Sequence, residues 1–89
     1  MKAQKFFMDA LNRVPDNIER QVNLSMSVSD RIAFILKERG MTQKDFARKM
    51  GRTEAEVSRW LGGTHNFTFS TIAKISSFFN EDIIQISAN

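Results

Sequence analysis

Residues 42–61 read TQKDFARKMGRTEAEVSRWL, and they place two short helical patterns back to back with almost no loop between them. Each pattern opens on a threonine with an acidic residue three positions later, Thr42 with Asp45 and Thr53 with Glu56. In such a start the hydroxyl accepts a hydrogen bond from a free backbone amide, and the acid complements the helix dipole. The stretch therefore predicts two helices joined by a tight turn.

The spacing of small and apolar residues identifies the kind of turn. With Gln43 as the first position, Ala47 is the fifth, Gly51 the ninth and Val57 the fifteenth. A small residue allows the helices to cross closely, glycine tolerates the positive φ of a sharp turn, and the valine packs the second helix back on the first. These linked positions predict a helix-turn-helix. A helical hairpin of an ordinary small bundle is the alternative.

Length and composition exclude several other classes of protein. A chain of 89 residues with 42% hydrophobic and 26% charged residues forms one domain, whose core is too small for a large internal cavity. Cysteine is absent and His65 is the only histidine, so we expect no metal site, no catalytic residue, no cofactor and no enzymatic activity. No apolar run is long enough to span a membrane and no secretory signal opens the chain, which predicts a cytoplasmic location.

The distribution of charge is consistent with a polyanion as partner but does not establish one. The net charge is +3, and residues 30–61 hold eight basic against five acidic side chains, while the flanks nearly cancel. A locally basic face suits DNA. A mixed, solvated helix surface gives the same count.

Helical patterns also precede the central stretch. Residues 4–14 have apolar side chains at helical spacing, and a second pattern runs over residues 15–39 until Gly40 stops it. Ser27 or Ser29 could cap a fresh helix within the second pattern. Residues 15–39 are therefore either one long helix or two.

A further helix is expected after the central stretch, beginning at Ser70 or Thr71 and ending near Phe79. Beyond it Ile84 and Ile86 alternate with polar residues, which predicts a short strand. A lone strand needs a partner, so we expect it to pair with the same strand of a second subunit.

The segment MTQKDFARKMGRTEAEVSRWLGG, residues 41–63, resembles the helix-turn-helix core of the phage Cro and repressor family of DNA-binding regulators, the XRE family. The resemblance covers residues 30–83. It implies an all-α fold, in which residues 30–89 form a five-helix repressor-like domain and residues 1–29 are an additional N-terminal helical extension. The segment SRWLGGTHNFTFSTIAKISSFF with the following EDII is similar to a bacterial subgroup that includes antitoxins of toxin–antitoxin pairs. A loop of this family packs one face on the domain, so the resemblance implies that Phe67 and Phe69 plug the core; the alternative is that they stack on bases.

In this motif the second helix enters the major groove of DNA. Its apolar side chains point inward, which leaves an outward, base-reading set of Glu54, Ala55, Ser58 and Arg59. Arg59 can present two donors to guanine, Glu54 can accept from cytosine, and Ala55 can touch a thymine methyl group.

Contacts to the DNA backbone are expected at the start of the first helix, around the turn and in the loop after the second helix. The candidates are Gln43, Lys44, Arg52, Thr53, Thr64, His65, Asn66 and Thr68. The resemblance implies that Gln43 bonds a phosphate, and the amides of that helix N-terminus add to the site. Thr53 is either a cap or a contact, and its position favours the cap.

The sequence thus predicts a sequence-specific, bacterial transcriptional regulator of the repressor type, which binds a palindromic double-stranded operator as a homodimer and could have a toxin protein as a partner. The alternative is a protein-interaction module that sequesters a partner, with DNA binding secondary or lost. The basic residues Arg52 and Arg59 and the small Ala55 favour DNA. An apolar cluster near the N-terminus either docks a partner or packs on its own domain; it comprises Phe6, Phe7, Met8 and Leu11.

Overall fold

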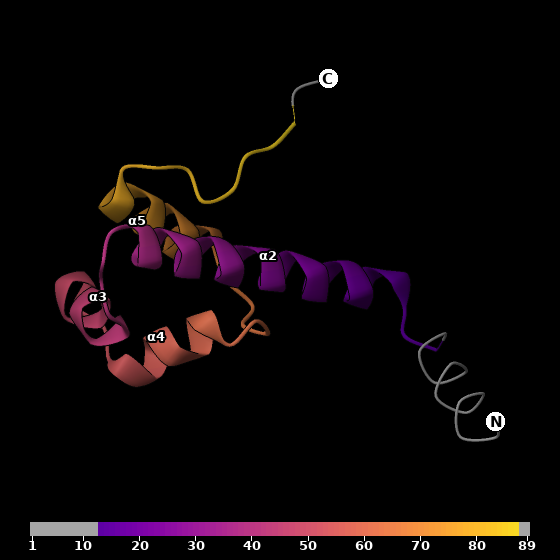
Figure 1. Ribbon diagram of the computed structural model, residues 1–89. Coiled ribbons are helices and arrows are strands. Elements are labelled where there is room, and N and C mark those ends of the chain that lie inside the picture. Colours follow the sequence, from indigo (N-terminus) through magenta and orange to yellow (C-terminus); the bar gives the residue numbers. More distant parts are fainter. Residues whose placement is uncertain (1–12, 88–89) are drawn as a thin grey trace.

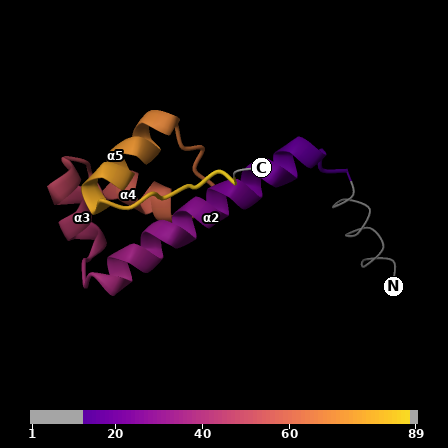
Figure 2. The same cartoon turned by 90° about the horizontal axis from the view of Figure 1, so that it is seen from above.

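The computed structural model describes residues 13–87, which form four helices and an extended tail (Figure 1). The helices are α2 (Asp16–Glu38), α3 (Gln43–Met50), α4 (Glu54–Leu61) and α5 (Phe69–Phe79). The three short helices gather around the second half of α2, whose first half runs on past them (Figures 1 and 2). The expected all-α fold is confirmed. The predicted helix at residues 4–14 lies outside the described residues except at its end, where Arg13 and Val14 form a turn and a bend and not a helix. Its apolar cluster lies wholly outside the described residues.

Residues 16–38 form one helix, which decides between the two alternatives left open by the sequence. Pro15 precedes it, and Gly40, with φ 64°, follows its end as expected. Ser29 caps no helix: it is 2% exposed, and its Oγ donates a hydrogen bond of 2.5 Å to the carbonyl oxygen of Trp60. The helix runs on through this point, and Val28 and Ile32 on either side of Ser29 are both buried in the core. The expected domain boundary at residues 29 and 30 falls inside α2, and the division into two parts stays a prediction.

The helix-turn-helix is confirmed in its local detail. The hydroxyl of Thr42 accepts from the amide of Asp45 at 3.1 Å, and that of Thr53 accepts from Glu56 at the same distance. Gly51 has φ 70°, in the left-handed region where a side chain is strained. Each cap satisfies a donor that the first turn of a helix leaves free, so both short helices start where the sequence predicts.

Phe46 of α3 is the centre of the core. It is fully buried, its ring stacks on Phe79 of α5 at 5.2 Å between centroids, and it meets the edge of Trp60 of α4 at 6.0 Å. Ile32 of α2 is buried in the same cluster. One aromatic ring thereby joins the short helices, and the packing determines which face of α4 is turned inward.

The start of α5 differs from the sequence prediction. Thr68 is its N-cap, accepting from the amide of Thr71 at 3.1 Å, so the helix begins at Phe69. Phe67 packs against the core as expected, but Phe69 is 88% exposed and plugs nothing. The reason is that the first turn of α5 lies at the rim of the core, where Phe69 lines a surface groove beside Leu24.

The expected fifth helix of the domain and the C-terminal strand are not found within residues 13–87. Asn80, with φ 57°, ends α5, and residues 84–87 have no regular secondary structure; in Figure 1 this tail rises away from α2. Glu81 holds the tail by ion pairs to Arg31 and Arg39, at 3.0 and 2.9 Å, and Ile83 is buried. Side chains of the same chain thus hold the start of the tail, and the described part of the tail has no ladder of backbone hydrogen bonds to define a strand.

Candidate nucleic-acid interface

Helix α4 has one buried and one open face. Val57 and Trp60 are buried and Leu61 is partly buried against the core. The opposite face consists of exposed side chains, namely Glu54, Ala55, Ser58 and Arg59. All four base-reading candidates therefore lie on the solvent side of α4, over an arc that the α-helical repeat makes continuous.

Arg59 differs from most arginines of the described chain. Among the seven in residues 13–87, five form ion pairs with a carboxylate: Arg20, Arg31, Arg39, Arg48 and Arg52. Within that part of the chain Arg59 forms none, and neither does Arg13, which precedes α2. A guanidinium without a carboxylate partner keeps its donors available for an external acceptor. On α4, Arg59 is such a group.

The structure brings Arg59 together with three of the predicted loop contacts. Arg59, Thr64, His65 and Asn66 line a surface hollow of about 320 Å³ with Gly62, at the C-terminal end of α4. The ring of His65 is held edge-on against Phe67, with 4.7 Å between centroids. Because Phe67 packs on the core, the loop is anchored to the domain and presents its polar groups beside Arg59.

Three of the side chains predicted to contact the DNA backbone already have partners within the protein. Arg52 is half-buried, with its Nη1 3.4 Å from an Oε of Glu56 and its guanidinium 5.9 Å from the ring centre of Trp60. Thr53 and Thr68 are the N-caps of α4 and α5. These side chains have a structural role that any contact with DNA has to share.

Gln43 and Lys44 are both exposed in the first turn of α3, and Lys44 forms no ion pair within the described residues. Beside them, hydrogen bonds from the side chain and backbone of Thr42 hold the pKa of Asp45 below its usual 3.8, and Arg48 and Lys49 add to the effect. The first turn of α3 thus carries a cation and a persistent anion at neutral pH. Within this turn, Lys44 has the side chain that can bind a phosphate.

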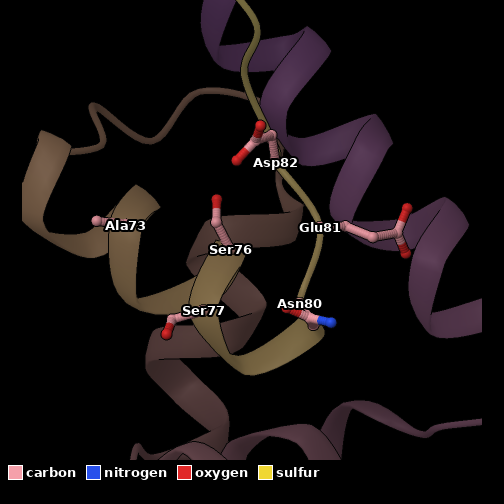
Figure 3. Close-up of a pocket in the computed structure, with 6 residues that line it drawn as sticks. All are labelled: Ala73, Ser76, Ser77, Asn80, Glu81 and Asp82. Atoms are coloured by element: carbon pink, nitrogen blue, oxygen red, sulfur yellow. The ribbon is translucent and has the colours of Figure 1, made fainter.

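Other parts of the described surface have structural explanations. An open hollow of about 470 Å³ lies at the end of α5. Figure 3 shows that Glu81, one of its lining residues, turns toward α2, where it pairs with Arg31 and Arg39. Ser76, also in this hollow, accepts from the amide of Ile83 at 3.1 Å. Nowhere in residues 13–87 do three His, Asp or Glu side chains meet as a metal site would require.

The four described helices include none with the length and apolar character needed to cross a membrane.

Two interactions of the helix-turn-helix were not predicted from the sequence. They are the hydrogen bond from Ser29 to the end of α4 and the ion pair of Arg52 with Glu56. The second had a signal, since Arg52 and Glu56 are four residues apart. The only sequence signal for the hydrogen bond of Ser29 was a small polar residue on an otherwise apolar helix face.

The fold and its open face define a helix-turn-helix DNA-binding domain. A profile of the Cro/C1-type helix-turn-helix DNA-binding domain family matches residues 31–87. The chain therefore belongs to this family, which is defined by DNA binding and not by catalysis. Comparisons with curated proteins and with solved structures give no significant match.

Proposed function

We propose that this protein is a sequence-specific transcriptional regulator that acts as a homodimeric repressor. The observation that carries the proposal is the exposed guanidinium of Arg59 on the outward face of α4, which no carboxylate of the described chain engages. A repressor of this type blocks transcription by occupying its operator, so it needs no catalytic group. Its selectivity depends on the side chains that reach base edges.

In the proposed complex α4 lies in the major groove. Arg59 presents two parallel donors to guanine, Glu54 accepts from cytosine, and Ala55 touches a thymine methyl group, with Ser58 as an adaptable donor or acceptor. Because Val57 and Trp60 are fixed in the core, the rotation of α4 about its own axis is determined before DNA arrives. Preorganisation of this kind favours discrimination between bases.

Phosphate contacts in the proposal flank the groove on two sides. Gln43 and Lys44 approach one backbone from the start of α3, and Thr64, His65 and Asn66 approach from the loop after α4. Such contacts fix register and orientation without reading sequence. Arg52, Thr53 and Thr68 contribute mainly by holding the helices in place, since each has an intramolecular partner.

Two substitutions test the division between reading and positioning. Arg59→Ala is expected to cost about 1–3 kcal/mol on the preferred operator and to relax the choice at one base pair. Lys44→Ala is expected to weaken all sequences alike and to lower the salt slope by about one. The measurement is titration of each variant on selected and scrambled DNA at several salt concentrations, with the operator first obtained by selection from a random library.

Lys74→Ala is the matched control, because Lys74 is exposed on α5, which lies across the core from α4 (Figure 1). The selected operator should contain two half-sites about 10 base pairs apart, centre to centre, as a two-fold dimer requires. If Arg59→Ala lost affinity equally for every sequence, or matched Lys74→Ala, α4 would not read bases. A protein-interaction scaffold would then be the better description.

A further inference from the structure

The C-terminal end of α4 is tied to α2 by a buried hydrogen bond. The Oγ of Ser29 donates to the carbonyl oxygen of Trp60 at 2.5 Å, and both residues are buried. The last four carbonyl groups of any helix find no donor within that helix. In α4 the carbonyl of Arg59 accepts from the amide of Gly62, and the carbonyl of Trp60 accepts from Ser29. Helix α2 therefore supplies part of the C-terminal capping of α4.

Ser29 reaches across to α4 although its own helix offers an acceptor. A serine within a helix can donate to the carbonyl four residues earlier, which here belongs to Ser25. A buried hydroxyl needs such a partner, because burial without a hydrogen bond is costly. The structure instead directs the hydroxyl of Ser29 to α4. Its one donor thus joins two helices that are distant in sequence.

A second contact from α2 lies just beyond the end of α4. The side chain of Met26 lies beside Gly63, where an added Cβ atom would be 3.6 Å from the Cγ of Met26. Gly63, with φ 90°, precedes the loop that we assign to phosphate contacts. Helix α2 thus supports both the last turn of α4 and the start of that loop.

These contacts constrain α4 in different ways. Burial of Val57 and Trp60 fixes which face of α4 is turned inward, but apolar attraction has no preferred direction and tolerates small shifts. A hydrogen bond holds its two atoms to a narrow range of distance and angle. Arg59 is next to Trp60 in the chain, so a shift of the Trp60 carbonyl also moves Arg59. A contact of two donors with guanine requires placement to about 0.5 Å.

We propose that Ser29 is a positioning residue for DNA recognition, which fixes the last turn of α4 and with it the place of Arg59 against a base. The inference rests on the proposed function, because it takes Arg59 as a base-reading side chain. Ser29 itself is buried among the helices and cannot reach DNA. Its effect on recognition passes through α4.

The first test measures how well a Ser29 variant distinguishes DNA sequences. Ser29→Ala should lower the preference for the selected operator over scrambled DNA by roughly 3- to 10-fold, and it should relax the same base pair as Arg59→Ala. Ile75→Val is the control for lost stability, because Ile75 is buried on α5, and it should leave the preference unchanged. Each variant is titrated well below its unfolding temperature.

A double substitution separates positioning from general weakening. If Ser29 acts through Arg59, then adding Ser29→Ala to Arg59→Ala causes no further loss of preference. Ser29→Cys keeps a side chain of similar size with a weak donor, so it should give a smaller loss than Ser29→Ala. This variant takes the place of Ser29→Ala if the alanine variant does not fold.

Amide hydrogen exchange tests the link between the helices without DNA. Ser29→Ala should speed exchange at the amides of Leu61 and Gly62 by at least about 5-fold more than at the amides of α3. Ile75→Val should affect α3 and α4 alike, because it loosens the core without removing a bond to α4.

The proposal is overturned if Ser29→Ala behaves like Ile75→Val in both measurements, weakens every DNA sequence equally, or adds its full loss to that of Arg59→Ala. If Arg59→Ala relaxes a base pair and Ser29→Ala does not, only this inference fails. If neither variant changes the preference while exchange at the end of α4 rises, the proposed function fails. The role of Ser29 in recognition then fails with it, and the residue only stabilises α4.

Discussion

The two halves of α2 share one apolar face and have different surroundings. Ile32, in the second half, is fully buried where the short helices pack against it, whereas Ile18, on the same face in the first half, is 41% exposed. Amphipathic spacing makes a helix with an apolar side. Whether that side is buried depends on which other elements the chain brings to it. Helices α3, α4 and α5 pack mainly against the second half of α2, and α5 also reaches Leu24 and Ser25, whereas Ile18 lies beyond them (Figure 1).

The largest expected effect comes from removing the same atoms from each half. Ile32→Ala should lower the free energy of unfolding by about 2–5 kcal/mol, because it leaves a cavity in a packed core. Ile18→Ala should cost less than about 1 kcal/mol in the monomer, since much of the side chain is already in water. Urea unfolding at concentrations low enough to prevent self-association measures both values. Equal losses would show that the first half of α2 is packed as tightly as the core.

A smaller effect is expected at the bond that joins α2 to α4. Ser29→Ala removes the donor to the carbonyl of Trp60, and a buried acceptor left without a partner costs about 1–3 kcal/mol. Ser27→Ala is the matched control, because Ser27 is exposed on the same helix and shares the change in helix propensity. Thermal unfolding of both variants measures the difference. If the two variants unfold at the same temperature, the hydrogen bond adds nothing to the stability of the packing between α2 and α4.

The smallest effect is expected at Asp45, in the first turn of α3. Since the pKa of Asp45 is held below 3.8 in the folded protein, its ionised form contributes stability that is complete above pH 3.8 and is lost as the pH falls through the folded pKa. Asp45→Asn should therefore be less stable than the natural chain at pH 7, and this gap should narrow at pH 3. Urea unfolding at both pH values measures the gap, and a gap independent of pH would contradict the assignment.

Sequence alone determined the helix-turn-helix. Its signals are local: two threonine caps, one glycine in the turn and apolar residues at helical spacing all lie within residues 42–61. These signals also predicted the open face of α4, because a helix that buries Val57 and Trp60 must turn Glu54 and Arg59 outward. No contact with a distant segment was needed to place them.

Tertiary structure alone decided what each polar and apolar group meets. Ser29 bonds a residue 31 positions away, and Glu81 pairs with Arg39 across 42 positions; neither distance is encoded in a local pattern. The same is true of Phe69, which the family resemblance assigned to the core and the fold leaves exposed at the groove. Helix periodicity specifies which side chains share a face, but only the packing of remote segments specifies where that face ends in water.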